Sequence, residues 1–296
     1  MGITIQQMES YYEYDPTKTC HEHPKQVLSL AEKSLLPILR VKMPKKLTHL
    51  IAATTCPDSI APSLGQSITQ KYHSVFGNCH VIDLVQGCAG GVSALILGSQ
   101  LAELHKSSVI VVLSDAARKS TSQNSKMMKI FGNGSYACLI TYENTAKGLM
   151  HNKSRQYKDL VDVVSIKLGH DASYVISQEL DITKDPRKYL GISINNYLAI
   201  KLLRKAKSFF NEFIEESSLP DVIILHQVNP SIVRVLKSVF KPYHCKFVDT
   251  SKITGNCGTA SIGIALHTIK QESQNKKIFL CSFGTGGVIT AGLWQN

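Results

Sequence analysis

Several residue types are scarce in this chain, and each scarcity excludes a class of protein. Tryptophan occurs once in 296 residues and aromatic residues make up 7%, too few for the stacking platforms that bind single-stranded nucleic acid. None of the eight cysteines forms a Cys-x-x-Cys pair, which argues against a zinc ribbon or a disulfide framework and favours a reducing compartment. No apolar run approaches the ~20 residues of a membrane span.

The amino-terminal region lacks targeting and metal-binding patterns. Glu9, Glu13 and Asp15 come early and no apolar block accompanies them, so we expect no secretory signal and a cytoplasmic protein. Cys20-His21-Glu22-His23 has suitable residue types for a metal but no partners at useful spacing elsewhere. We interpret this segment as a loop and expect no metal site.

Acidic residues are outnumbered by basic ones, 22 to 33, which gives a formal charge of +11. This excess predicts an acidic partner or ligand, but the basic residues are scattered and no nucleic-acid motif is present. After Pro230, the residues Arg234, Lys237 and Lys241 share one helix face beside the turn that contains His226. Such a face suits phosphopantetheine or coenzyme A as an anionic carrier; a solvated helix face is the alternative.

Cys88 is the most informative residue that is present. It lies in Gly87-Cys-Ala-Gly-Gly91, at the start of an apolar helix-like run. The first N–H groups of a helix are unpaired and carry partial positive charge, which favours a thiolate and predicts a nucleophile. A small buried cysteine packed under a helix is the alternative.

The setting of Cys88 returns in the second half of the chain as Gly255-Asn-Cys-Gly-Thr-Ala-Ser261. Pro62 precedes Cys88 by 26 positions, and Pro230 precedes Asn256 by the same 26. Each half then reaches an apolar strand and a glycine-rich hairpin. We therefore interpret the chain as one β/α unit used twice, with an amino-terminal half at residues 1–150 and a carboxyl-terminal half at 151–296.

Short β-branched runs alternate with stretches of helical periodicity, which predicts an α/β architecture with buried strands. The expected helices are residues 25–40, 62–75, 89–104, 190–217, 230–240 and 258–271. Residues 144–189 are interpreted as the connection between the halves, with a strand at Val161–Leu168.

His226 ends the apolar strand Val222–Leu225 and opens a polar turn, at the kind of strand end where α/β sheets bind ligands. Asn256 corresponds in the second half to Cys88 in the first. We expect the two equivalent helix starts to face each other, which places a cysteine, a histidine and an asparagine around one cavity.

Taken together, these segments resemble the thiolase-fold condensing enzymes, and among them the β-ketoacyl-acyl carrier protein synthase III group. The resemblance covers roughly residues 47–296 and rests on Asp83–Leu95, Phe131–Gly134, His226–Asn229, Gly255–Ser261 and Phe283–Gly287. It implies a five-layered αβαβα core made of two duplicated halves, a dimer, and Cys88, His226 and Asn256 as a catalytic triad. No resident cofactor is implied, because phosphopantetheine or coenzyme A enters as the substrate carrier.

The implied reaction has two stages. An acyl thioester first loads Cys88, with the oxyanion held by the N–H of Cys88 and by the turn that contains Thr285 and Gly286. A malonyl-type thioester then binds with its carbonyl between His226 and Asn256, loses carbon dioxide and attacks the acyl group.

Departures from the family pattern predict a specialised or secondary-metabolite pathway. The amino-terminal region is shorter than the one in which the family carries a Trp and an Arg for coenzyme A. Ala61 replaces a usual phenylalanine in the acyl tunnel of the dimer mate, which predicts a longer or wider acyl group. Ser231 stands where an arginine docks the carrier protein, so Arg234 and Lys237 are the expected substitutes.

Two other functions fit the same motifs. One is an acyltransferase that passes the acyl group from Cys88 to an amine or alcohol; the other is a non-catalytic subunit of a heterodimer. His226 and Asn256 together favour condensation, because simple transfer needs a general base more than a paired clamp. The sequence does not predict the identity of the acyl group, nor whether its carrier is coenzyme A or a carrier protein.

Overall fold

Two five-stranded sheets dominate the structure, a computed structural model that describes residues 2–17, 26–44, 46–121, 126–143, 147–168 and 190–295. The first sheet has the order β1-β5-β4-β2-β3 and the second β10-β9-β11-β12-β6. The first contains β1 (Gly2–Glu13), β2 (Leu47–Ala53), β3 (His80–Leu84), β4 (Ser108–Ala116) and β5 (Asn133–Glu143). The second contains β6 (Gly148–Gln156), β9 (Val222–Leu225), β10 (Lys246–Val248), β11 (Lys277–Gly284) and β12 (Val288–Gln295).

The two sheets have the same connectivity, which confirms the duplication predicted from the sequence. In the first, β2 pairs in parallel with β3 and β4, while β5 pairs antiparallel with β4 and β1. In the second, β9 pairs in parallel with β10 and β11, while β12 pairs antiparallel with β11 and β6. Because β6 opens the second sheet, we propose that the halves divide between β5 and β6, near residue 150.

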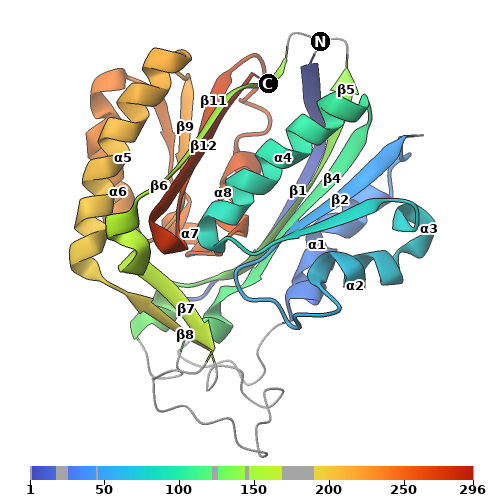
Figure 1. The fold of residues 1–296 in the computed structure, drawn as a ribbon, viewed down its shortest axis with the longest axis horizontal. Helices are drawn as coiled ribbons and strands as arrows, with labels where there is room; N and C mark the ends of the chain where they lie inside the picture. Colours follow the sequence, from blue (N-terminus) through green and yellow to red (C-terminus); the bar gives the residue numbers. More distant parts are fainter. Residues whose placement is uncertain are drawn as a thin grey trace, which may run out of the picture.

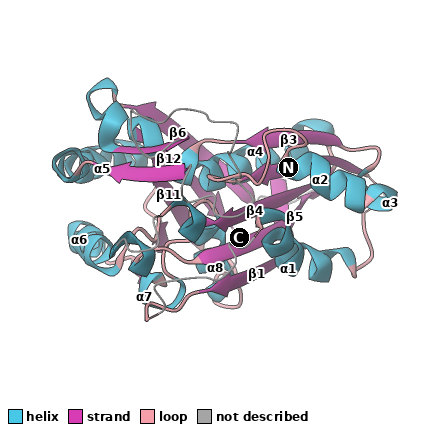
Figure 2. Cartoon of the chain, turned by 90° about the horizontal axis from the view of Figure 1, so that it is seen from below, coloured by secondary structure: helices cyan, strands magenta, loops and turns pink. Residues whose placement is uncertain are grey.

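Helices separate and cover the sheets in five layers (Figures 1 and 2). Two of them, α4 (Gly90–His105) and α8 (Ala260–Thr268), lie between the sheets and contact both. The first sheet is covered by α1 (Val27–Leu39), α2 (Leu64–Lys71) and α3 (His73–Phe76). The second is covered by α5 (Asn196–Glu216) and α6 (Pro230–Phe240), while α7 (Ser251–Thr254) precedes α8. The predicted αβαβα order is therefore confirmed.

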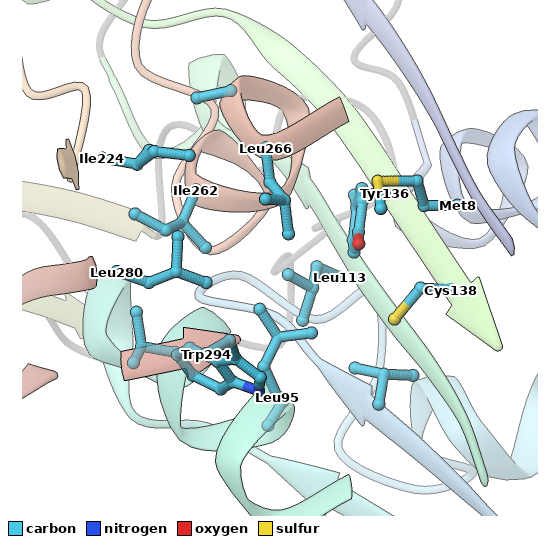
Figure 3. Close-up of a cluster of buried hydrophobic side chains, with 14 of the residues drawn as sticks. Met8, Leu95, Leu113, Tyr136, Cys138, Ile224, Ile262, Leu266, Leu280 and Trp294 are labelled. Carbon is cyan, nitrogen blue, oxygen red and sulfur yellow. The ribbon is translucent and has the colours of Figure 1, made fainter. Parts of the chain in front are cut away.

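The largest apolar core fills the middle layer, where side chains from α4, α8 and both sheets meet (Figure 3). Trp294 belongs to this core, with its indole N–H donated to Ser99 Oγ at 3.2 Å. The stretch Gly87–His105 is long and apolar enough to cross a membrane, but 61% of it is buried inside the protein. The position of α4 between the two sheets explains this composition, because a helix that packs against protein on several sides needs apolar residues on each of them.

The helix predicted at 190–217 was wrong at its start. Residues Leu190–Ile194 form β8, which pairs antiparallel with β7 (Val164–Leu168). The helix α5 begins only after Asn195, whose side chain accepts the backbone N–H groups of Tyr197 and Leu198 at 3.1 and 3.2 Å. The predicted strand at Val161–Leu168 also begins later, after a 3₁₀ segment at Lys158–Val163.

The helix predicted at 62–75 is divided in two. α2 ends at Lys71, and Tyr72 has a non-helical backbone with φ −116° and ψ 44° before α3 begins at His73. The helix α5 buries Leu202, Phe209, Phe210 and Phe213 against the second sheet.

Candidate active site

Cys88 lies in a tight turn between β3 and α4. Residues Gly87–Ala89 form one 3₁₀ turn, and Gly87 has a left-handed backbone with φ +54°. A Cβ on Gly87 would also collide with the hydroxyl of Thr285. Glycine is required here for both reasons, and the turn after β11 is thereby brought against the backbone beside Cys88.

The thiol of Cys88 is protonated at rest. Burial raises its pKa to about 12, with further raising effects from Asp115 and Cys56. The backbone N–H of Cys88 lowers the pKa but does not outweigh the burial. Burial thus opposes the thiolate predicted from the helix start, because desolvation of a charged sulfur acts against the effect of the unpaired N–H groups.

The starts of α4 and α8 meet in the middle layer, as the duplication predicted. A Cβ on Gly91 would collide with the backbone oxygen of Thr259, and one on Gly90 would lie 3.3 Å from the Thr259 methyl group. Cys88 precedes the first of these helix starts and Asn256 precedes the second. The structure thus brings the two equivalent turns to one place.

His226 and Asn256 form a direct, buried pair. The ring Nε2 lies 3.1 Å from the Asn256 Oδ1, and the same oxygen accepts the N–H of Gly258 at 3.0 Å. Because Gly258 supplies a backbone donor, the atom facing it is the amide oxygen, and Nε2 therefore carries the proton. Within the described ranges, the amide nitrogen of Asn256 has no acceptor.

Burial lowers the pKa of His226, although Asn256, the Phe283 backbone and Asp115 each act in the opposite direction. The ring is therefore neutral near pH 7. Its Nδ1 is buried and makes no hydrogen bond of normal geometry with the described part of the chain. The backbone of His226 is fixed by its N–H, which donates to Cys281 O at 2.9 Å.

The motif Phe131–Gly134 holds the backbone of Asn256. The N–H of Gly132 donates to Asn256 O at 3.0 Å, and Asn256 N–H donates to Ile130 O at 2.8 Å. A Cβ on Gly132 would collide with the backbone oxygen of Thr254. Sequence reasoning linked this motif to the family but assigned it no task; the structure shows that it anchors Asn256.

The turn predicted to supply oxyanion donors is Thr285–Gly287. Gly286 and Gly287 have left-handed backbones with φ +73° and +69°, and Gly286 O accepts from Gln156 Nε2 at 3.1 Å. Thr285 contacts the position of Gly87, so the turn lies beside the Cys88 backbone. Cys257, by contrast, is fully buried and its thiol donates to Thr254 O at 3.3 Å.

Other predicted residues lie away from this centre. Ala61 is on an exposed loop of its own chain, so a tunnel position for it requires a second protomer. Arg234 and Lys237 are exposed on α6 and line a groove of about 600 Å³ whose floor includes Ile223 and Phe247. Since Ile223 lies toward the start of β9, the groove is displaced from His226. The segment Cys20–His23 lies outside the described residues.

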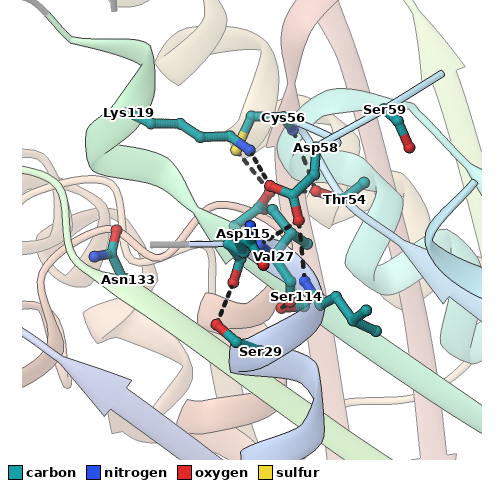
Figure 4. A network of polar contacts seen from close by, with 12 residues as sticks. Val27, Ser29, Thr54, Cys56, Asp58, Ser59, Ser114, Asp115, Lys119 and Asn133 are labelled. Atoms are coloured by element: carbon teal, nitrogen blue, oxygen red, sulfur yellow. Dashed lines mark hydrogen bonds and ion pairs between the residues drawn. The ribbon is translucent and has the colours of Figure 1, made fainter. Parts of the chain in front are cut away.

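A buried carboxylate, Asp115, was missed. It is the penultimate residue of β4, where it accepts hydrogen bonds from the loop after β2 (Figure 4). It also accepts hydrogen bonds from Thr259. The available signal was a single acid at the end of an otherwise apolar strand, because a buried charge needs partners to be tolerated.

The chain is similar in sequence to β-ketoacyl-[acyl-carrier-protein] synthase III proteins. The profile of the C-terminal part of 3-oxoacyl-[acyl-carrier-protein] synthase III matches residues 216–296. The β-ketoacyl-[acyl-carrier-protein] synthase III of Streptococcus thermophilus is 26% identical over 254 residues, which cover 82% of this chain and 75% of that protein.

Solved structures show the same fold. The β-ketoacyl-[acyl carrier protein] synthase III of Thermus thermophilus has a TM-score of 0.78 and 19% identity, covering 99% of this chain and 98% of the other. The 1,3,6,8-tetrahydroxynaphthalene synthase of Streptomyces coelicolor, a type III polyketide synthase, has a TM-score of 0.68 and 15% identity, covering 84% and 71%. At such identities the structural likeness establishes the fold alone.

Proposed function

Since the chain is a thiolase-fold acyltransferase similar to β-ketoacyl-[acyl-carrier-protein] synthase III, we propose that it forms a carbon–carbon bond between two thioesters. Cys88 is the acyl acceptor, and His226 and Asn256 bind the second thioester. The observation that carries the proposal is the buried contact of 3.1 Å between His226 and Asn256. Two polar side chains brought together in a desolvated place are suited to stabilise charge that develops on a substrate oxygen.

In the first stage the Cys88 sulfur attacks the thioester carbonyl. The carbon–sulfur bond of the donor breaks, and the proton of Cys88 ends on the leaving thiol. The tetrahedral oxyanion is held by the N–H of Cys88 and by N–H groups of Thr285 and Gly286. The contact of Thr285 with Gly87 supports this role, because it keeps the glycine turn next to the nucleophile.

In the second stage a malonyl-type thioester places its carbonyl oxygen against His226 Nε2–H and the Asn256 amide N–H. Loss of carbon dioxide leaves an enolate, whose carbon attacks the acyl carbon on Cys88. The Cys88 sulfur leaves as a thiolate and takes a proton from solvent. The neutral state of His226 supports this arrangement, since a neutral Nε2–H donates without adding a buried charge.

We propose that Arg234 and Lys237 attract the acidic carrier of one thioester. Their exposure on α6 and the neighbouring Lys241 and His244 around the groove support an anionic partner. The carrier is either a carrier protein or coenzyme A.

A dimer is the proposed assembly, as a homodimer or with another thiolase-fold chain. β3 is an edge strand of the first sheet, and Val85 and Ile60 near it are exposed at 68% and 92%. An unpaired edge with apolar neighbours favours pairing with another chain. Ala61 in the adjoining loop then reaches the partner's acyl tunnel, and its small side chain favours a long or wide acyl group in a specialised pathway. The burial of α4 inside the protein supports a soluble protein, and the cytoplasm is the proposed compartment.

The test is release of labelled carbon dioxide from a malonyl thioester by enzyme loaded with an acyl group. The acyl adduct is first located on Cys88 by mass spectrometry, with Cys88→Ala as control. Release that depends on the adduct supports condensation. An adduct that moves to an amine or alcohol without release supports the alternative transferase, and a protein that forms no adduct contradicts the assignment of Cys88.

A further inference from the structure

Asp115 is a fully buried carboxylate with an unusual number of donors. Its Oδ1 accepts the N–H of Thr55 at 2.6 Å and the hydroxyls of Thr54 and Thr55 at 2.9 and 2.8 Å. Its Oδ2 accepts the N–H and hydroxyl of Thr259 at 2.6 and 2.7 Å. Since every one of these partners donates, the group is an ionised carboxylate whose charge is stabilised by hydrogen bonds.

The two oxygens of Asp115 serve different halves of the protein. Oδ1 holds the Thr54–Cys56 segment that follows β2 in the first half (Figure 4). Oδ2 holds the start of α8 in the second half, and Gly258 approaches so closely that a Cβ there would collide with it. Gly258 also has φ +58°, so no other residue fits the turn without strain.

A short chain of contacts leads from this carboxylate to the proposed site. Thr259 is fixed by Asp115, and the preceding Gly258 donates its N–H to Asn256 Oδ1 at 3.0 Å. That oxygen in turn contacts His226. The orientation of the Asn256 amide therefore depends on a turn whose position Asp115 determines.

We propose that Asp115 is a positioning residue for condensation, acting from β4 to fix the Gly258–Thr259 turn and through it the amide of Asn256. The inference rests on the proposed function of Cys88, His226 and Asn256. Asp115 touches no reacting atom in this arrangement; it joins the two halves at the point where their contributions to the site meet.

The negative charge of Asp115 acts on the pKa of nearby groups in a direction that can be measured. It raises the pKa of Cys88 and also that of His226. The carboxylate therefore disfavours the thiolate while it orders the residues of the second stage. The titration of Cys88 therefore reports whether the charge of Asp115 is present near the sulfur, and the ratio of condensation to acylation reports the positioning of Asn256.

The experiment compares Asp115→Asn with Asp58→Asn. Asp58 is a nearby carboxylate that pairs with Lys119 at 2.7 Å and accepts the N–H of Val27 at 2.7 Å, and it is not among the charges that act on Cys88. Three quantities are measured for each variant: the alkylation rate of Cys88 against pH, the rate of Cys88 acylation, and the rate of condensation.

For Asp115→Asn we expect half-maximal alkylation at lower pH, retained acylation, and condensation reduced about 100-fold by misplacement of Asn256. For Asp58→Asn we expect an unchanged alkylation profile and an unchanged ratio of condensation to acylation. A folded Asp115→Asn protein with the wild-type ratio of condensation to acylation overturns the inference, whatever its alkylation profile.

Thr259 supplies a second test that keeps the carboxylate, in case Asp115→Asn does not fold. Thr259→Val removes one donor to Oδ2 and should lower condensation relative to acylation without moving the alkylation profile, whereas Thr259→Ser should restore condensation. Equal rates in all three Thr259 forms contradict the positioning role. If wild-type protein never forms an acyl adduct on Cys88, the proposed function fails instead, and the alkylation profile still reports on Asp115.

Discussion

The Nε2 of His226 lies 3.1 Å from the Oδ1 of Asn256, so the only ring donor of this buried, neutral histidine is used within the protein. A substrate carbonyl that enters between the two side chains must take this N–H from the asparagine oxygen. The asparagine oxygen still accepts the Gly258 N–H at 3.0 Å. Transfer of the His226 N–H to the substrate therefore does not leave Asn256 Oδ1 without a hydrogen bond.

Replacement of Asn256 by alanine should separate the two stages. We expect condensation to fall by about 100- to 1,000-fold, as for loss of one oxyanion donor, while acylation of Cys88 continues. Intact mass reports the adduct and labelled carbon dioxide reports condensation. The matched control is Asn195→Ala, which removes only the cap of α5 and should cost about 1 kcal/mol of stability without changing that ratio. Equal loss of both stages in Asn256→Ala argues against a role confined to the second.

The reactivity of Cys88 should rise steeply with pH. Its pKa is raised to about 12, so the folded protein holds a thiol at neutral pH and the thiolate fraction grows about tenfold per pH unit below that value. The measurement is alkylation by iodoacetamide, followed at the peptide that contains Cys88. A rate that reaches a plateau near neutral pH would show that the thiolate predicted from the helix start is present after all.

Reversal of charge on α6 should weaken recognition of a carrier protein. Arg234→Glu with Lys237→Glu is expected to raise KM for carrier-bound thioesters by about tenfold, because an attractive surface becomes a repulsive one. A short free thioester should be used at the wild-type rate. Arg204→Glu with Lys207→Glu makes the same charge change on exposed positions of α5 and is the control. If both pairs act alike, only net charge matters and the docking face is not at α6.

Gly132→Ala should displace the backbone segment that is hydrogen-bonded to Asn256. The added methyl collides with the oxygen of Thr254, so the segment that pairs with Asn256 must move, at a cost of about 1 to 3 kcal/mol in the free energy of unfolding. We expect condensation to fall more than acylation. Urea unfolding measures the stability, and the rates of acylation and condensation give the ratio of the two stages.

The control for Gly132→Ala is Gly98→Ala in α4, where an added methyl meets side chains of Val111 and Ile140 in the core. That variant should lose stability and keep the ratio of the two rates. A Gly132→Ala protein that keeps the wild-type ratio would show that the loop does not position Asn256.

The duplication explains why so much of the site was visible in the sequence. Cys88 and Asn256 occupy equivalent turns, so the repeat itself predicted that α4 and α8 would meet, and the contact of Gly91 with Thr259 confirms it. The pKa of Cys88 was not predictable in this way. It depends on burial and on Asp115 and Cys56, which come from other segments and act only once the chain is folded.

Local sequence periodicity also failed to predict a strand whose pairing partner is distant in the sequence. Residues Leu190–Ile194 form β8 because Val164–Leu168 is available to pair with them, and periodicity near residue 190 carries no sign of that partner. Asp115 was missed for a related reason. Its donors, Thr54, Thr55 and Thr259, come from positions up to 144 residues away.

The order of the duplicated sheets has a consequence for synthesis on the ribosome. All five strands of the first sheet precede residue 144, whereas His226, Asn256 and Thr259 follow later. Domains generally fold in the order in which they emerge, so the amino-terminal half holds Cys88 and Asp115 before His226, Asn256 and Thr259 have been synthesised. The nascent chain therefore carries the Cys88 thiol without the groups that we propose act with it, and the proposed site is complete only when the last third of the chain has docked.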